Sequence, residues 1–477
     1  MPDLPDWSTR TVCVAGLGVS GFAAADALLQ LGSRVVVVDA RTADEIGGHA
    51  DILGILGADL RLGAETAQVL PEGIDLVVTS PGWRPAAPLL LQAAAAGVPV
   101  WGEVELAWHL RPANRPAPWL VVTGTNGKTT TVRMLASILE AAGHRAVAAG
   151  NIGTPIVEAV LADPPYDVIA VELSSFQLHW THSIRPLASA VLNVAPDHVD
   201  WHGSMESYAL DKGKAYQGTE VACVYNVQDP QTEALLREAE VQDGCRAVGF
   251  TLGIPGVGML GVVEDVLVDR AFEPQRRDSA AELAAVSDVK PFAPHNIANA
   301  LAAAALARAF GVPARAVRDG LRGFRPDGHR IASAGRVGEV DYVDDSKATN
   351  PHAASASLAA YDSVVWIAGG LAKGAAFDDL VQRAAPRLRA VVLLGRDRAV
   401  IADALRRHAP QIPVVEVGTT DTGVMDEVVV AAAALAQPGD TVLLAPACAS
   451  MDLFNNYGER GDAFVASVGR LPGAAAR

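Results

Sequence analysis

The clearest chemical pattern in the sequence is Thr123-Gly-Thr-Asn-Gly-Lys-Thr-Thr130, between an apolar run and a helix-forming segment. Glycines let the backbone wrap closely around phosphate, and the start of the following helix adds roughly +0.5 charge. Lys128 would neutralise the β- and γ-phosphates, and the Thr129 hydroxyl would bind Mg²⁺. Val122 stands where the generic loop has its first glycine. The pattern predicts a nucleotide phosphate loop, and a plain strand-to-helix turn is the alternative.

Two further candidate ligands follow strands expected at Val168–Glu172 and Ala190–Val194. Glu172 ends the first strand and His198 comes just after the second. The carboxyl edge of an open α/β sheet is the usual place for ligands. Since Mg²⁺ prefers oxygen ligands, His198 taken by itself is more often a surface or core histidine than a metal ligand.

Two other turns have suggestive chemistry. Gly16-Leu-Gly-Val-Ser-Gly21 follows the expected strand Thr11–Ala15, and Asp39 ends the next strand. This is a βαβ dinucleotide-type pattern, but its third glycine comes one residue early, so NAD is a poor candidate and a structural turn stays open. Asp344-Asp-Ser-Lys-Ala-Thr-Asn350 also follows a strand, and helix capping alone would explain its polar residues.

The elements that position these residues fall into three α/β blocks. We expect domains at residues 1–110, 111–326 and 327–477, each built on a largely parallel sheet. Residues 242–282 read as a β-rich excursion, and 296–310 as an Ala-rich helix. Strands in the last block are expected at residues 340–343, 364–368, 390–394, 414–417 and 441–445.

Composition excludes several classes of protein. The 38 Lys and Arg against 54 Asp and Glu give a net charge of −16, which argues against a nucleic-acid partner. The four scattered cysteines form no CxxC pair, so no zinc or disulfide framework is indicated. The first ten residues are unlike a signal peptide, and no apolar run approaches a membrane span of about 20 residues. We expect a cytoplasmic protein with no membrane partner.

Six motifs in order resemble the Mur ligase and folylpolyglutamate synthetase family. Besides the phosphate loop they are Gly150-Asn-Ile-Gly153, Glu172-Leu-Ser-Ser-Phe-Gln-Leu178, Asn193 to His198, His295-Asn-Ile-Ala-Asn299 and Gly328-His-Arg330. The resemblance implies a Rossmann-like N-terminal domain, a central P-loop ATPase-like domain and a Rossmann-like C-terminal domain. It also implies an ATP-dependent amide ligase that works through an acyl phosphate.

The resemblance further implies two Mg²⁺ sites. Thr129 and Glu172 would hold one, and Glu172, His198 and a carbamylated Lys212 the other. Only a neutral amine reacts with CO₂, and an ordinary lysine is about one part in 2,500 neutral at pH 7. Burial must therefore lower the pKa of Lys212. Lys214 is a near neighbour in the sequence.

The amino-acid motif Asp345-Ser-Lys-Ala-Thr-Asn350 resembles the D-glutamate-adding branch of the family. The implied substrates are UDP-N-acetylmuramoyl-L-alanine and D-glutamate, bound by a protein expected to be a monomer. By resemblance, ATP contacts Gly124, Thr125, Asn126, Gly127, Lys128, Thr129, Thr130, Asn296, Arg330 and Asp345. The UDP-substrate contacts Leu17, Ser20, Asp39, Arg41, Asn151 and Ser174, and D-glutamate contacts Lys347, Thr349, Lys373, Ser450 and Tyr457.

Two positions depart from the family pattern. Lys373 lacks the usual Asp-Gly before it, and Tyr457 stands where phenylalanine is common. The alternatives are a ligase for a different amino acid, a P-loop kinase or regulatory NTPase, and a dehydrogenase inferred from the first block alone.

Overall fold

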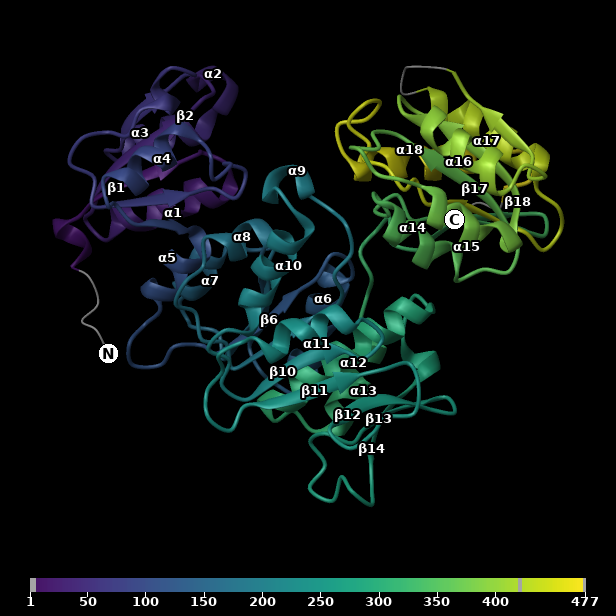
Figure 1. Ribbon diagram of the computed structural model, residues 1–477, viewed down its shortest axis with the longest axis horizontal. Coiled ribbons are helices and arrows are strands. Elements are labelled where there is room, and N and C mark those ends of the chain that lie inside the picture. The colour runs from purple at the N-terminus through teal and green to yellow at the C-terminus, as the bar shows by residue number, and fades with distance from the viewer. Residues whose placement is uncertain (1–5, 419–422, 475–477) are drawn as a thin grey trace. The chain divides into compact units, whose positions relative to one another are not determined.

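The computed structural model describes residues 6–418 and 423–474, and its three β-sheets are each accompanied by helices (Figure 1). The expected three-domain α/β architecture with largely parallel sheets is confirmed. The chain divides into two compact units, which are Met1–Asp288 with Ala298–Phe324, and Val289–Ile297 with Arg325–Arg477. The first unit holds the first two sheets and the second unit holds the third.

The N-terminal sheet is a five-stranded parallel sheet in the order β3-β2-β1-β4-β5. Its central strands are runs of Val and Ala buried on both faces, as a parallel sheet between helices requires. The strands are β1 (Thr11–Ala15), β2 (Arg34–Asp39), β3 (Asp59–Leu62), β4 (Leu76–Thr79) and β5 (Val100–Gly102). The helices are α1 (Val19–Gln30), α2 (Ala43–Ile46), α3 (Gly48–Ile55), α4 (Pro88–Ala95) and α5 (Glu103–Leu110).

The central sheet has nine strands in the order β14-β13-β12-β11-β10-β9-β6-β8-β7, parallel from β7 to β12. The β-rich excursion expected at residues 242–282 supplies β11 to β14 and ends in two antiparallel pairings. The strands are β6 (Trp119–Thr123), β7 (Ala146–Gly150), β8 (Val168–Glu172), β9 (Ala188–Val191), β10 (Ala222–Asn226), β11 (Arg246–Phe250), β12 (Met259–Val263), β13 (Val266–Asp269) and β14 (Ala281–Ala285).

The central helices are mostly short. They are α6 (Lys128–Ala141), α7 (Ile156–Val160), α8 (Ser175–His179), α9 (Val199–His202), α10 (Met205–Gly213), α11 (Pro230–Arg237), α12 (Pro294–Phe310) and α13 (Ala314–Gly323). Because β9, β6 and β8 are neighbours, the loops that follow their carboxyl ends meet at one edge of the sheet. Those loops carry the phosphate motif, Glu172 and His198.

The third sheet has six strands in the order β15-β16-β20-β17-β18-β19, with only β15 antiparallel. Its strands are β15 (Ala332–Val337), β16 (Val340–Asp344), β17 (Val364–Gly369), β18 (Leu388–Leu394), β19 (Val414–Glu416) and β20 (Thr441–Leu444). Its helices are α14 (Pro351–Leu358), α15 (Asp378–Ala384), α16 (Arg398–His408), α17 (Val424–Leu435) and α18 (Tyr457–Gly469).

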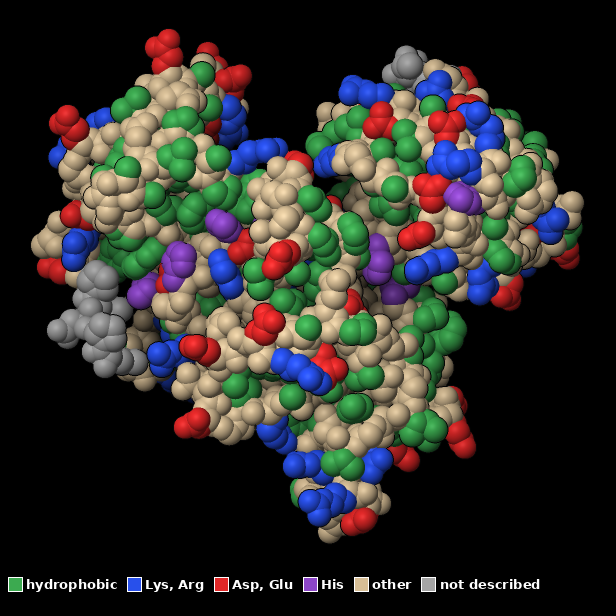
Figure 2. All heavy atoms as spheres, in the orientation of Figure 1, with side chains coloured by type: hydrophobic (Ala, Val, Ile, Leu, Met, Phe, Trp, Pro, Cys, Tyr) green, Lys and Arg blue, Asp and Glu red, His purple; other side chains and the backbone are tan. Residues whose placement is uncertain are grey.

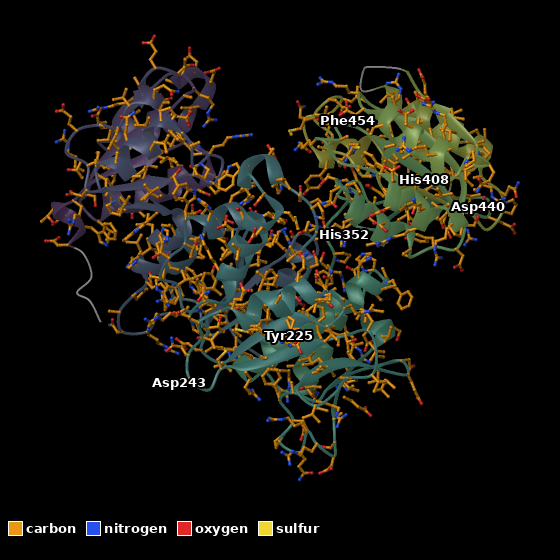
Figure 3. The ribbon with its side chains drawn as sticks, viewed as in Figure 1. Tyr225, Asp243, His352, His408, Asp440 and Phe454 are labelled. Atoms are coloured by element: carbon orange, nitrogen blue, oxygen red, sulfur yellow. The ribbon has the colours of Figure 1, made fainter. Side chains whose placement is uncertain are left out.

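A buried aspartate anchors one end of a central strand of this sheet. Asp440, labelled in Figure 3, precedes β20 and accepts hydrogen bonds from Ser363 Oγ at 2.6 Å and Arg389 Nε at 2.8 Å. It fixes the amino end of the strand, opposite the carboxyl edge.

On the face shown in Figure 2, basic and acidic side chains are interspersed. Within the described residues, no helix combines the length and apolarity needed to cross a membrane.

Candidate active site

The phosphate loop joins β6 to α6 and depends on glycine at two positions. Gly124 and Gly127 have φ of +152° and +84°, where L side chains are strained. A Cβ on Gly127 would lie 2.3 Å from Asn299 Oδ1, which comes from α12. The loop is therefore packed closely against a helix far along the chain, and Thr129 and Thr130 lie buried in the first turn of α6.

Asn193, just beyond β9, holds the loop in place. Its Oδ1 accepts from the Asn126 N–H at 2.9 Å, its Nδ2 donates to the Asn126 carbonyl at 3.0 Å, and its own carbonyl accepts from the Thr125 N–H at 3.0 Å. The Thr125 hydroxyl lies 2.9 Å from the Tyr208 hydroxyl of α10. These bonds fix the loop backbone before any ligand binds.

Two lysines converge on the loop. Lys128 Nζ donates to the carbonyls of Gly124 at 2.9 Å and Thr125 at 3.0 Å, and Lys212 Nζ donates to the same Gly124 carbonyl at 2.9 Å. Lys212 is 1% exposed, and its ammonium lies 4.6 Å from the centre of the Tyr208 ring. Burial, reinforced by the charge of Lys128, holds the pKa of Lys212 well below its usual value. The lysine expected to react with CO₂ is thus the one whose surroundings favour a neutral amine.

Glu172 ends β8 with one satisfied and one orphaned carboxylate oxygen. Oε1 accepts from Asn151 Nδ2 at 2.8 Å, while Oε2 is buried and has no hydrogen-bond partner among the described residues. A buried carboxylate oxygen is costly unless a donor or a cation satisfies it. Together with the buried Thr129 hydroxyl, this oxygen suits a Mg²⁺ ion, which prefers such oxygen ligands.

His198 and Ser174 occupy equivalent places on neighbouring helices. His198 is the N-cap of α9, with φ of +53° and its ring 4.7 Å from Phe176. Ser174 is the N-cap of α8 and forms a capping box with Gln177. Lys212 lies in α10, which contacts both α8 and α9.

The N-terminal turn brings three of its four predicted residues together. The Leu17 N–H donates to Asp39 Oδ2 at 2.7 Å, and Arg41 donates to Asp39 Oδ1 at 3.0 Å and to the Leu17 carbonyl at 3.0 Å. Burial acts to raise the pKa of Asp39, but the hydrogen bonds from Arg41 and Leu17 outweigh it. The pKa of Asp39 is therefore lower than usual. Ser20 instead hydrogen-bonds Glu103, whose pKa burial raises to about 7.

In the second unit, the segment after β16 carries Asp345 and Lys347. Asp345 is buried, which raises its pKa to about 6 even though it accepts from the Ser357 hydroxyl and from the Ile331 N–H at 3.3 Å. Arg330 adds an opposing charge nearby. Lys347 Nζ lies 4.0 Å from the centre of the Tyr457 ring, and the Thr349 N–H donates to the Lys347 carbonyl at 2.8 Å.

Backbone bonds join three loops at the carboxyl edge of this sheet. The Ala447 N–H donates to the Ala348 carbonyl at 2.8 Å, and Leu371 and Ala449 exchange bonds of 2.9 and 3.0 Å. The loops bearing Lys347, Lys373 and Ser450 are therefore adjacent. Lys373 has φ of +51°, and Ser450 is buried.

The predicted residues form separate clusters, two in the first compact unit and one in the second. Asn296 belongs to the second unit, where its Nδ2 donates to the Pro291 carbonyl at 3.0 Å.

Sequence reasoning missed several residues that shape these clusters. Arg460 of α18 is 1% exposed and donates to Ser346 Oγ at 2.9 Å and to the Cys448 carbonyl at 3.1 Å, so it ties two site loops together. Asn299 packs on Gly127, and Asn193 and Tyr208 brace the loop. Asn193 and Asn299 stood in recognised motifs, whereas Tyr208 and Arg460 carried no signal of this role.

The phosphate loop is held by hydrogen bonds and lies beside a buried carboxylate oxygen that has no partner among the described residues. On a chain with three α/β sheets, these features define a multidomain nucleotide-dependent enzyme. Comparison with known families matches residues 10–102 to the Mur ligase MurD-like N-terminal domain, 122–307 to the Mur ligase middle domain and 329–448 to the Mur ligase glutamate ligase domain. The chain belongs to the Mur ligase family.

Close relatives share nearly the whole chain. A protein of Streptomyces coelicolor named UDP-N-acetylmuramoylalanine–D-glutamate ligase is 63% identical over 468 residues, covering 98% of this chain and 99% of the relative. A protein of the same name from Thermobifida fusca is 59% identical, covering 97% and 99%. The structure of MurF ligase from Thermotoga maritima in complex with ADP matches with a TM-score of 0.58 at 15% identity, covering 97% and 98% of the two chains, and so shows a shared fold.

Proposed function

We propose that this chain is an ATP-dependent ligase that joins D-glutamate to UDP-N-acetylmuramoyl-L-alanine in the synthesis of peptidoglycan precursors. The observation that carries the proposal is 63% identity, over 98% of the chain, to a relative that bears the name of this activity. The enzyme acts in the cytoplasm as a monomer.

ATP binds at the loop between β6 and α6. The N–H groups of the loop and of the first turn of α6 receive the phosphates, and Lys128 exchanges its two carbonyl partners for the β- and γ-phosphate oxygens. Asn296, Arg330 and Asp345, all in the second compact unit, are the further residues that we assign to ATP.

Thr129 and Glu172 would hold one Mg²⁺ ion beside ATP, and Glu172, His198 and Lys212 would hold a second. When bound, they neutralise charge that develops on the transferring phosphoryl group. Glu172 contributes the buried oxygen that lacks a partner. Lys212 contributes a carbamate: its neutral amine forms an N–C bond to CO₂ and releases one proton, giving an anionic oxygen ligand.

The chemistry has two steps. A carboxylate oxygen of the L-alanyl group attacks the γ-phosphorus, the bond to ADP breaks, and an acyl phosphate forms. The amine of D-glutamate then attacks the acyl carbon, loses a proton and displaces phosphate, leaving an amide. Lys128 stabilises charge in the first step, and binding the amine beside the acyl group can supply an effective molarity of about 10⁵–10⁸ M.

Each substrate has its own residues. Leu17, Ser20, Asp39, Arg41, Asn151 and Ser174 lie around the UDP-substrate, and Asp39 contributes by holding Arg41 in place. Leu17 is 1% exposed, so its contribution is from the backbone rather than the side chain. D-Glutamate carries two carboxylates, and it is held by Lys347, Thr349, Lys373, Ser450 and Tyr457. Two lysines serve two carboxylates, while the amine stays free to attack.

The test is phosphate release from ATP with UDP-N-acetylmuramoyl-L-alanine and a panel of D- and L-amino acids. The expected result is turnover with D-glutamate well above every other amino acid. Preference for a diamino acid or an L-amino acid would place the enzyme in a neighbouring branch of the family. Phosphate release without any amino acid would instead indicate an NTPase.

A further inference from the structure

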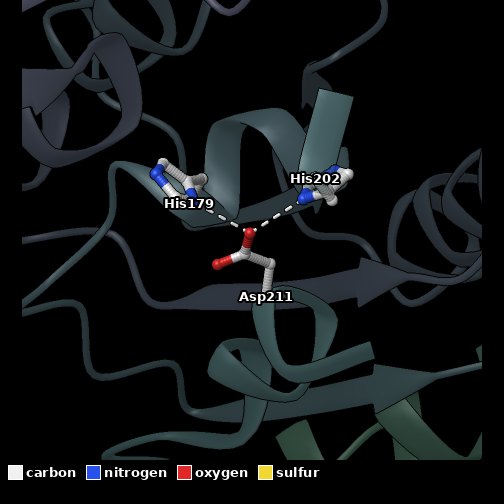
Figure 4. Close-up of side chains that lie close together, drawn as sticks. All are labelled: His179, His202 and Asp211. Atoms are coloured by element: carbon white, nitrogen blue, oxygen red, sulfur yellow. Dashed lines mark hydrogen bonds and ion pairs between the residues drawn. The ribbon is translucent and has the colours of Figure 1, made fainter. Parts of the chain in front are cut away.

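Asp211 joins the ends of three short helices through a single carboxylate (Figure 4). Its Oδ2 accepts from His179 Nδ1, in the last turn of α8, at 2.8 Å and from His202 Nδ1, in the last turn of α9, at 3.0 Å. Its Oδ1 pairs with Lys214 Nζ at 2.9 Å. Both carboxylate oxygens are therefore used. The two histidines come from α8 and α9, and Lys214 is the C-cap of α10 itself.

His202 extends the network to Ser175. Its side chain is fully buried, and its Nε2 lies 3.0 Å from Ser175 Oγ in the first turn of α8. Ser175 is 2% exposed, so its hydroxyl cannot reach a substrate. The hydroxyl, imidazole and carboxylate in series therefore hold the helices in register and do not form a nucleophile.

Each of the three helices carries one residue of the proposed site. Ser174 caps α8, His198 caps α9, and Lys212 directly follows Asp211 in α10. We infer that Asp211 is the positioning residue that sets the relative placement of Ser174, His198 and Lys212. It thereby sets the geometry in which the Lys212 carbamate would bind a metal ion. This inference rests on the proposed ligase function.

A metal ion is the other use for these side chains. Ligand atoms of His179, His202 and Asp211 lie within 4.8 Å of one another. However, both imidazoles already bond to Asp211 Oδ2, and the Lys214 ammonium on Oδ1 would repel a cation at this distance. The structure thus favours a hydrogen-bonded clamp.

The experiment compares Asp211→Asn with a control variant, Asp243→Asn. Asp243, labelled in Figure 3, is an exposed aspartate in the segment between α11 and β11. Asparagine has nearly the same volume as aspartate. However, it has a single neutral acceptor oxygen, so it cannot accept hydrogen bonds from all three donors. Misplacement of catalytic groups by about 1 Å can cost about 100-fold, so kcat should fall 10- to 100-fold. The KM for ATP should change much less than kcat, because Asn193 holds the phosphate loop from a position outside α10.

Two variants of His202 separate positioning from bulk stability. Asn can place a donor where Nδ1 lies and keep the bond to Asp211, whereas Gln reaches the Nε2 position and keeps only the contact with Ser175. His202→Asn should retain much more kcat than His202→Gln, at matched secondary structure by circular dichroism. This pair also carries the test if Asp211→Asn does not fold.

Three results would overturn the inference. They are wild-type kcat in Asp211→Asn, equal kcat in the two His202 variants, and a stoichiometric transition metal in the purified protein that Asp211→Asn loses. Inactive wild-type enzyme would count against the proposed ligase function instead, so the two failures are distinguishable.

Discussion

The Glu103→Gln variant should lose less folding stability than the wild-type protein as the pH rises from 5 to 8. Glu103 begins α5, where its side chain is 2% exposed and Oε1 accepts from the Val157 N–H at 3.4 Å. Its Oε2 is buried without a partner among the described residues. Burial outweighs the hydrogen bonds from Ser20, Val157 and Ile156 and raises the pKa to about 7. The folded protein therefore favours the neutral acid, which glutamine resembles in shape and charge.

The size of the effect follows from the shift in pKa. A carboxyl with a folded pKa near 7 and an unfolded pKa of 4.5 stabilises the fold fully below pH 4.5 and loses that contribution as pH rises through 7. At 1.36 kcal/mol per pKa unit, the full loss is about 3 kcal/mol, of which about 2–3 kcal/mol falls between pH 5 and 8. The variant should gain that amount relative to wild type over this interval.

Glu105→Gln is a matched control with the opposite sign. Glu105 is equally buried, but hydrogen bonds from His109, His182 and Ser183 overcome burial and lower its pKa to about 2. Its contribution is present above pH 4.5 and is lost only as pH falls towards 2, so Glu105→Gln should destabilise by a nearly constant amount from pH 5 to 8.

Urea unfolding at pH 5, 6, 7 and 8 measures both variants. The reasoning about Glu103 is refuted if the difference in unfolding free energy between Glu103→Gln and wild type is the same at pH 5 and pH 8.

Three further predictions concern the active-site lysines. Lys128→Ala should nearly abolish ATP-dependent phosphate release while leaving the thermal unfolding temperature close to wild type; normal turnover in a folded variant would remove this lysine from the mechanism. Lys212 should carry a carbamate, which crystals grown with bicarbonate and UDP-substrate would reveal; density that ends at a bare ammonium would contradict it. Lys347→Ala should raise the KM for D-glutamate about 10- to 150-fold, because it removes a charge-assisted bond of about 1.5–3 kcal/mol. The KM for ATP should change little. An unchanged KM for D-glutamate would exclude this pocket.

Strands buried on both faces were predictable from sequence, and edge strands were not. Thr11–Ala15 and Val168–Glu172 are observed with the predicted bounds, because continuous apolar runs mark interior parallel strands. The edge strands β3 and β15 mix exposed and buried residues and gave no such signal. The bounds predicted for the strand at Ala190–Val194 are wrong: β9 is Ala188–Val191. Asn193 lies just beyond the strand, where its side chain bonds to the phosphate loop.

The parts of the site defined by short motifs were predictable, and the contacts that brace them were not. The loop from Gly124 to Thr130 announces itself through glycine, lysine and threonine in fixed order. The contact of Asn299 with Gly127, by contrast, joins residues far apart in the sequence. Arg460 is an unremarkable residue of a helix until the fold buries it against Ser346 and Cys448. Such long-range pairings depend on topology, which local patterns do not encode.

The pairing of Asp39 affects which nucleotide analogues could serve as inhibitors. In dinucleotide-binding folds, the acid at the end of the second strand accepts from the ribose hydroxyls of the cofactor. Here Arg41 and the Leu17 N–H already satisfy both oxygens of Asp39. An adenosine-based compound aimed at this turn would have to break a charge-assisted bond before gaining one. A compound with an anionic group placed for the half-exposed Arg41 guanidinium would leave that pair intact, which gives medicinal chemistry a route to selectivity over dehydrogenases.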